Sequence, residues 1–319
     1  MEHKNMSMVT SFIISGISDE PLLQFFVFLL VLFIYLITLV GNITIFLLIC
    51  LDYHLHTPMY FFLANLSILD ISCSTITLHK ILTSFISGDH SVSDLECVVQ
   101  IFSFLSLTSD ELLLLTAMSY DRYIAICNPL RYLLIMDSKL CCLLASLCWV
   151  IGLLEGIPLF MGIYKLTCFV SNKVDHFFCD IVPIMKLSCS DTSFLQLYIF
   201  TEGVFLGGFT PFALTFISYI FIISTILSIR SSTGRRKAFY TCSSHLTVVI
   251  CLYGSLVFQY LRPTSSINLD SSKYFSLFNT AAVPILNPLI YSLKNKDVKA
   301  AMRRKMGITA GSTQLQDHN

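Results

Sequence analysis

Long apolar segments alternate with short polar segments along the whole chain of 319 residues. A helix needs roughly 20 apolar residues to cross the hydrocarbon core of a bilayer. Backbone groups in lipid must be hydrogen-bonded internally, so segments of this length predict helices rather than the strands of about 10 alternating residues found in barrels. The expected membrane-spanning helices cover Leu23–Ile49, Pro58–Ser84, Cys97–Ile126, Leu140–Tyr164, Gln196–Ile229, Ala238–Leu261 and Tyr274–Leu293.

Composition supports this interpretation over a set of buried helices in a soluble protein. The chain is 55% hydrophobic and 13% charged, whereas soluble domains carry about 25% charged residues. No Asp, Glu, Lys or Arg occurs between Pro21 and Leu51. This run is too long for the apolar part of a cleavable signal peptide, roughly 7–15 residues. We therefore expect the first helix to act as its own insertion signal.

The distribution of basic residues predicts the orientation in the membrane. With the N-terminus outside, thirteen Lys and Arg residues lie on the cytoplasmic side and seven on the other, as expected from the positive-inside rule. We predict an all-α integral membrane protein of the plasma membrane with one seven-helix domain. It comprises an extracellular N-terminus over residues 1–22, the bundle over 23–293 and a cytoplasmic tail over 294–319.

The start of this tail is amphipathic. Between Lys294 and Met306, Val298, Ala301 and Met302 follow helical spacing with basic residues between them. Such a segment can lie in the headgroup layer, where Lys and Arg meet anionic lipid. A solvated basic tail is the alternative.

Four of the twelve cysteines lie at the predicted extracellular face: Cys97, Cys168, Cys179 and Cys189. Extracellular cysteines tend to form disulfides, and four allow three pairings, between which spacing cannot choose. Zinc binding would favour tightly spaced CxxC-like pairs, which are missing, so we expect no metal site. Asn5 begins a glycosylation sequon, Asn5-Met6-Ser7, on the same side.

Several ionisable residues fall inside the expected helices, where they are costly and often functional. A helical projection at about 100° per residue puts Glu111 and Arg122 on the inward face of the third helix. Asp70 and Glu111 are expected partners, with Asn42 and Asn287 as polar neighbours. These groups form either a cation or water site that changes between two states, or a static hydrogen-bonded network. Two further carboxylates, Asp110 and Glu155, are expected to find local hydroxyl partners.

No catalytic arrangement is recognisable. The histidines are scattered, and HExxH, P-loop and GxGxxG patterns are absent. We therefore expect neither an enzyme nor a bound cofactor. A seven-helix transporter or channel is the alternative class, but it would favour internal repeats and broken helices in matching positions. The two halves of the chain show no such similarity.

Short motifs occur in a fixed order, about one per expected helix. They are Gly41-Asn42, Leu55-His56-Thr57-Pro58-Met59-Tyr60, Leu66-Ser67-Ile68-Leu69-Asp70, Met118-Ser119-Tyr120-Asp121-Arg122-Tyr123-Ile124-Ala125-Ile126-Cys127, Ser218-Tyr219, Lys237-Ala238-Phe239-Tyr240-Thr241-Cys242-Ser243-Ser244-His245-Leu246 and Pro284-Ile285-Leu286-Asn287-Pro288-Leu289-Ile290-Tyr291. Together they span most of the chain and are highly specific. The chain resembles the odorant receptors, a family of rhodopsin-like G-protein-coupled receptors. Three positions depart from the usual pattern of that family: Ser119, Tyr240 and Leu252.

The resemblance implies that small, largely apolar volatile odorants bind inside the bundle and that the receptor activates a heterotrimeric G protein. It also implies a G protein of the stimulatory olfactory type, which raises cyclic AMP. The residues implied in activation and coupling are Asp121, Arg122, Tyr123, Tyr219, Asn287, Pro288 and Tyr291. The disulfides implied are Cys97–Cys179 and Cys168–Cys189.

Physical arguments accompany these implications. A carboxylate beside Arg122 can hold its guanidinium in a resting state. Pro288 removes one backbone hydrogen bond and permits a kink, and Asn287 can pair with the carbonyl groups that are freed. Such an element can adopt two forms, and a ligand that favours one form shifts the population.

A ligand cavity is expected in the extracellular half of the bundle. Its predicted lining is apolar and aromatic with a few hydroxyl groups, which suits a small hydrophobic molecule with one hydrogen-bonding group. Plain helix packing also explains such an aromatic stripe. An amine receptor would have a carboxylate where Phe104 stands, and a retinal opsin would need a Lys in the seventh helix. The predicted lining residues are Phe104, Leu105, Thr108, Ser109, Val204, Gly207, Tyr253, Leu256, Val257, Tyr260, Leu277 and Thr280.

Overall fold

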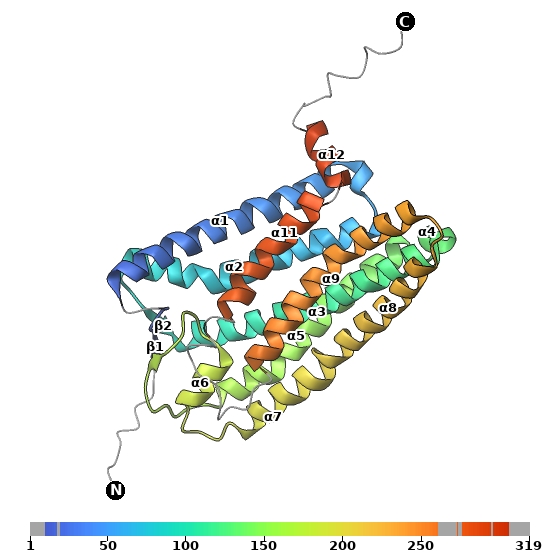
Figure 1. The fold of residues 1–319 in the computed structure, drawn as a ribbon. Helices are drawn as coiled ribbons and strands as arrows, with labels where there is room; N and C mark the ends of the chain where they lie inside the picture. Colours follow the sequence, from blue (N-terminus) through green and yellow to red (C-terminus); the bar gives the residue numbers. More distant parts are fainter. Residues whose placement is uncertain (1–9, 18–19, 261–272, 274–275, 295, 306–319) are drawn as a thin grey trace, which may run out of the picture.

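A computed structural model describes residues 10–17, 20–260, 273, 276–294 and 296–305. Helices dominate it, and three short strands lie at one end (Figure 1). The elements in chain order are β1 (Ser11–Ile14), α1 (Pro21–Leu51), η1 (Tyr53–Leu55), α2 (Pro58–Ser87), β2 (Ser91–Ser93), α3 (Asp94–Cys127), η2 (Pro129–Arg131), α4 (Tyr132–Ile135), α5 (Ser138–Tyr164), β3 (Lys173–Val174), α6 (Ile181–Leu187), α7 (Ser193–Thr201), η3 (Glu202–Leu206), α8 (Phe209–Ser228), α9 (Ser232–Tyr260), η5 (Phe278–Ala282), α11 (Val283–Lys294) and α12 (Lys296–Lys305).

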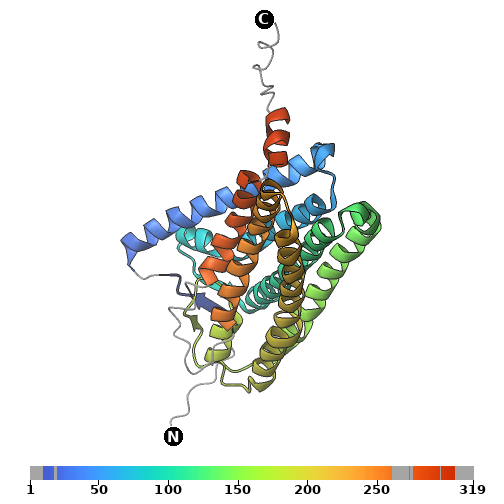
Figure 2. The same cartoon turned by 45° about the vertical axis from the view of Figure 1, so that its right-hand side comes forward.

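The predicted seven-helix bundle is confirmed. Six helices of the described part are long and apolar enough to cross a membrane, namely α1, α2, α3, α5, α8 and α9. The shorter apolar helix Phe278–Ile290, built from η5 and α11, completes the seven. α3 runs through the middle of the bundle and packs against α2, α5, α8 and α9 (Figures 1 and 2).

The expected continuous fifth helix is corrected by the structure. Within Gln196–Ile229 the chain forms α7, a π-helical turn η3 and then α8. The backbone N–H of Gly207 donates to the carbonyl oxygen of Glu202 at 3.0 Å, an i→i+5 bond that widens the turn. Glycine is a weak helix former, and Gly203, Gly207 and Gly208 lie close together here. This turn places Glu202 and Gly207 at the cavity described below.

Hydrogen bonds at helix ends explain where the expected boundaries shift. α3 begins at Asp94 rather than Cys97, because Ser93 and Glu96 form a reciprocal capping box. Acidic residues are favourable in the first turn of a helix, so the polar segment before Cys97 continues the helix. Hydropathy alone places such a boundary too late.

The strands form a small sheet at the end of the bundle where α1 begins, which we call the sheet end. β1 lies between β2 and β3, antiparallel to β2 and parallel to β3. Phe12 and Ile14 of β1 are 1% and 3% exposed. The sequence analysis did not predict these strands, because each is only two to four residues long.

The opposite end of the bundle carries α12, and we call it the α12 end. Val298 and Ala301 are buried there, 1% and 0% exposed. Asp52, which follows α1, accepts two hydrogen bonds from the Arg304 guanidinium, at 3.1 and 2.7 Å. This pairing holds the pKa of Asp52 below its usual range. α12 is therefore an amphipathic helix docked on the first loop.

Candidate functional site

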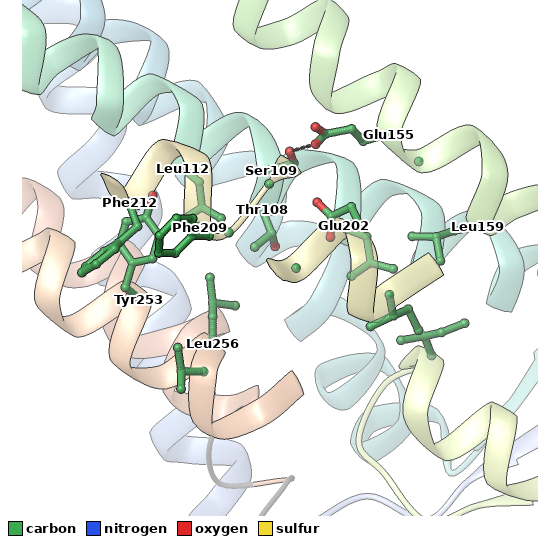
Figure 3. Close-up of a pocket in the computed structure, with 18 of the residues that line it drawn as sticks. Thr108, Ser109, Leu112, Glu155, Leu159, Glu202, Phe209, Phe212, Tyr253 and Leu256 are labelled. Atoms are coloured by element: carbon green, nitrogen blue, oxygen red, sulfur yellow. Dashed lines mark hydrogen bonds between the residues drawn. The ribbon is translucent and has the colours of Figure 1, made fainter. Parts of the chain in front are cut away.

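A cavity of about 570 Å³ lies between α3, α5, η3, α8 and α9, nearer the sheet end. Cavities of about 300–1,000 Å³ are typical of small-molecule sites. Most of the lining is apolar, and Phe209, Phe212 and Tyr253 form an aromatic wall on one side (Figure 3). Its polar side chains are Thr108, Ser109, Glu155, Glu202 and Tyr253.

Seven of the twelve predicted lining residues do line this cavity. The lining residues are Leu105, Thr108, Ser109, Gly207, Tyr253, Leu256 and Val257. The side chains of Val204 and Tyr260 lie outside the described part of the structure.

Three predicted lining residues lie elsewhere. Phe104 packs edge-on against Phe178 of the long loop between α5 and α7, residues 165–192, with ring centroids 5.2 Å apart. Leu277 joins the apolar clusters near α1 and α2. Thr280 is fully buried and donates to the backbone carbonyl of Ser276 at 2.9 Å. The long loop folds back onto the outer part of α3, which a helical projection of α3 alone does not reveal.

The prediction missed the two glutamates of the cavity. Glu155 of α5 accepts a hydrogen bond from the Ser109 hydroxyl, and the Glu202 carboxyl reaches the cavity from η3 (Figure 3). Glu155 was expected to find a local hydroxyl partner, and Ser109 is that partner. Their ionisable character inside apolar helices was the available signal. The turn that brings in Glu202 was not predictable from hydropathy.

Asp110 behaves differently from Glu155. It is 1% exposed, and neither of its carboxyl oxygens has a hydrogen-bond partner within the described residues. The expectation of a local hydroxyl partner for Asp110 is therefore wrong in this structure. Its carboxyl lies so close to Gly152 of α5 that a Cβ there would overlap it.

Two disulfides hold the sheet end together. Cys97 at the start of α3 is bonded to Cys179 of the long loop, and Cys168 is bonded to Cys189 within that loop. These are the pairs that the resemblance implied. Gln100 of α3 accepts a hydrogen bond from the Cys179 backbone N–H at 2.9 Å. The loop is thereby fixed to α3 next to the cavity.

His176 of the same loop is 0% exposed, stacks on Phe177 and packs edge-on against Phe178. Burial lowers its pKa to about 3, and the positive charge of Lys273 acts in the same direction. The hydrogen bond from the Phe178 backbone N–H and the charge of Asp175 oppose the shift in pKa. The imidazole is therefore neutral in the folded loop at neutral pH.

The predicted polar core is assembled only in part. The Asn287 side-chain amide donates to both Asp70 oxygens at 3.0 Å. Glu111 lies close enough to Asp70 for their charges to interact. Asn42 instead donates to the backbone carbonyls of Thr38 and Pro284, both at 3.1 Å, and so links α1 to α11. Gly41 permits this approach, since a Cβ there would lie 3.0 Å from the Cβ of Pro288.

Arg122 is held at the α12 end by its sequence neighbour. The Arg122 Nε donates to Asp121 at 2.9 Å, and an Nη donates to the same carboxyl oxygen. The Tyr132 hydroxyl donates to the other Asp121 oxygen at 2.7 Å. Both Asp121 oxygens thus accept hydrogen bonds, and the Arg122 guanidinium is bonded to this carboxylate.

A second set of bonds joins α3, α8 and α9. The Tyr219 hydroxyl pairs with His245 Nδ1 at 2.7 Å, and His245 Nε2 pairs with the backbone carbonyl of Leu115 at 3.1 Å. Tyr219 was predicted as an activation residue, whereas His245 was not. The available signal was the presence of His245 inside an expected membrane-spanning helix.

The remaining predicted residues can be placed only in part. Tyr123 is half-buried and packs against Phe221 with ring centroids 5.9 Å apart. Pro288 lies inside α11. The Tyr291 side chain and Asn5 fall outside the described residues.

Comparison with known proteins gives one consistent result. The family model "Olfactory receptor" matches residues 31–307. Human "Olfactory receptor 6C1" is 46% identical over 298 residues, which cover 93% of this chain and 95% of that protein. Mouse "Olfactory receptor 5AR1" is 43% identical over 96% of this chain and 99% of that protein. The chicken "Olfactory receptor-like protein COR5" is 45% identical over 94% and 96%, respectively. The chain therefore belongs to the olfactory receptor family of G-protein-coupled receptors.

Proposed function

We propose that odorants bind in the cavity between α3, α5, η3, α8 and α9 and that their binding activates a stimulatory G protein at the α12 end. Family membership establishes odorant reception as the function and speaks against an enzyme, a transporter and a channel. The cavity is the observation that carries the location of the site, because its volume and mostly apolar lining fit a small hydrophobic molecule.

The orientation and the signalling partner are part of this proposal. The N-terminus and the sheet end face the extracellular space, where an oxidising environment favours the two disulfides and Asn5 can carry a glycan. The α12 end faces the cytoplasm, in line with the excess of Lys and Arg on that side. Release of Arg122 from Asp121 then exposes a cationic group to the G protein, with Tyr123, Tyr219, Asn287, Pro288 and Tyr291 supporting the change in shape. Raised cyclic AMP is the expected output.

The test is a panel of odorants applied to cells that express the receptor, with cyclic AMP as the readout. Leu256→Trp adds bulk inside the cavity and should reduce potency by at least about tenfold for every agonist, because bound ligand and indole compete for one space. Val150→Trp, at an exposed position on α5 outside the cavity lining, adds a side chain of the same size and is the matched control. Full potency in Leu256→Trp at normal surface expression would place the site elsewhere.

The type of G protein is tested in cells without the stimulatory α subunit. The cyclic AMP response should disappear there and return when that subunit is restored. A response that persists would contradict stimulatory coupling while leaving the location of the odorant site untouched.

A further inference from the structure

The cavity contains two carboxyl groups and no basic partner for them. Among the described residues that line it, none is Lys, Arg or His. The four ion pairs of the described structure involve neither Glu155 nor Glu202. The Ser109 hydroxyl bonds one Glu155 oxygen, and no hydrogen bond to the Glu202 carboxyl occurs among the described residues. Two carboxyl groups are thus exposed to a mostly apolar space.

The carboxyl groups lie close enough together to share one cation. A carboxyl oxygen of Glu202 and one of Glu155 both lie within 3.6 Å of the point where a Cβ on Gly207 would sit. An ammonium nitrogen lies about 2.7–2.9 Å from each carboxylate oxygen to which it donates. A single ammonium group placed between the two carboxyl oxygens can therefore contact both. Gly207, which has no side chain, leaves room for the Glu202 carboxyl beside it.

A third polar group marks the opposite side of the cavity. Tyr253 is 8% exposed, and its hydroxyl makes no hydrogen bond of ordinary geometry among the described residues, although Thr116 is a neighbour. Phe212 packs edge-on against the Tyr253 ring at 5.3 Å between centroids. Figure 3 shows this aromatic group across the cavity from the two glutamates. A molecule with an ammonium at one end and an aromatic or otherwise apolar body fits both sides.

We propose that this receptor recognises odorants carrying a protonated amino group, with Glu155 and Glu202 together binding the ammonium. Burying carboxylates without a partner is costly, and like charges at close range add repulsion. A cation between them relieves both effects, whereas a neutral odorant of the same shape relieves neither. The carboxylates come from α5 and η3, so the place of Phe104 on α3 is no obstacle. This inference rests on the proposed odorant site and names its ligand class.

The experiment compares phenethylamine with phenethyl alcohol, which share a body and differ in the charged group. Saturable binding of radiolabelled phenethylamine is measured on membranes that contain the full-length receptor, and cyclic AMP is measured in parallel. The wild-type receptor should bind the amine at least about tenfold more tightly than the alcohol, as expected for charge-assisted hydrogen bonds. Absence of saturable amine binding, or equal affinity for both compounds, overturns the proposal.

Glu155→Gln and Glu202→Gln keep the shape of each side chain and remove its charge. Each should weaken amine binding at least about tenfold, the double variant should abolish it, and alcohol binding should stay within about threefold. Glu96→Gln is the matched control, because it removes an extracellular carboxylate outside the cavity lining. Unchanged amine affinity in both single variants and in the double variant overturns the proposal.

The outcomes separate this proposal from the one on which it rests. Amine binding that depends on both glutamates but raises no cyclic AMP supports the ligand class and contradicts the coupling. Binding of the alcohol that is lost in Leu256→Trp, with no preference for the amine, supports the cavity and contradicts the ligand class.

Discussion

Polar groups near the two ends of the helix bundle differ in their hydrogen bonding. Toward the sheet end, the cavity leaves the Tyr253 hydroxyl and the Glu202 carboxyl without hydrogen bonds among the described residues. Toward the α12 end, the Asp121 carboxyl is bonded on both oxygens, by Arg122 and Tyr132. Unpaired polar groups next to a cavity favour the arrival of a ligand, whereas satisfied groups hold one conformation. The contrast therefore separates a part of the bundle that can bind a ligand from a part that stabilises one conformation.

The largest effect on signalling is expected at the α12 end. Arg122→Ala should abolish odorant-stimulated cyclic AMP while the receptor still reaches the cell surface, because the group released from Asp121 is gone. Arg131→Ala, which removes an exposed cation next to α4 at the same end, is the control and should signal normally. Undiminished signalling by Arg122→Ala with normal expression would contradict the role of the Asp121–Arg122 pair.

The next largest effect concerns the link between the long loop and α3. Cys97→Ser breaks the bond to Cys179, and loss of a native disulfide typically costs about 2–5 kcal/mol. We expect surface expression to fall severalfold or more, measured by labelling of intact cells. Cys50→Ser removes an exposed free thiol and should leave expression unchanged. Peptide mapping under non-reducing conditions that joined Cys97 to Cys168 or Cys189 would contradict the pairing itself.

As the pH falls, the sheet end should lose stability before the α12 end does. The pKa of His176 is about 3 in the folded loop, against about 6.5 in an unfolded chain. The contribution of neutral His176 to the free energy of unfolding is therefore complete above about pH 6.5. It is lost as the pH falls toward about 3, and the loss is about 2 kcal/mol at about pH 5. The thermal midpoint of the purified receptor should drop over this range.

His176→Gln separates this effect from other acid effects. A glutamine does not titrate here, so the variant should be less stable at neutral pH but should lose less stability on acidification than the wild type. An equal drop in both proteins would show that His176 does not carry the acid sensitivity.

The smallest effect is expected where α8 and α9 meet. Tyr219→Phe removes the hydrogen bond to His245 and costs about 0.5–1.5 kcal/mol. If this bond favours the resting form, basal cyclic AMP should rise about two- to tenfold. Tyr53→Phe, which changes an exposed tyrosine at the α12 end, is a control for removing a phenol. A fall in basal activity would mean that the bond supports the active form instead.

Much of the fold was predictable because its cause is local. The apolar length of each segment predicts a membrane-spanning helix without reference to any partner. Individual residues proposed to act in activation, such as Arg122 and Asn287, stood out because they lie within ordered motifs. The cavity was predictable as a face of α3 and α9, and Thr108, Ser109 and Tyr253 do line it.

Contacts between distant segments were not predictable in this way. The long loop folds over α3 and covers Phe104, and the glycine-rich turn η3 brings Glu202 to the cavity. His245 acquires its role only because Tyr219 and Leu115 lie beside it. Helical periodicity predicts which direction a side chain faces on its own helix. The packing of one element against another decides which residues that side chain contacts. Only the tertiary structure therefore showed that two carboxyl groups lie close together in a mostly apolar cavity.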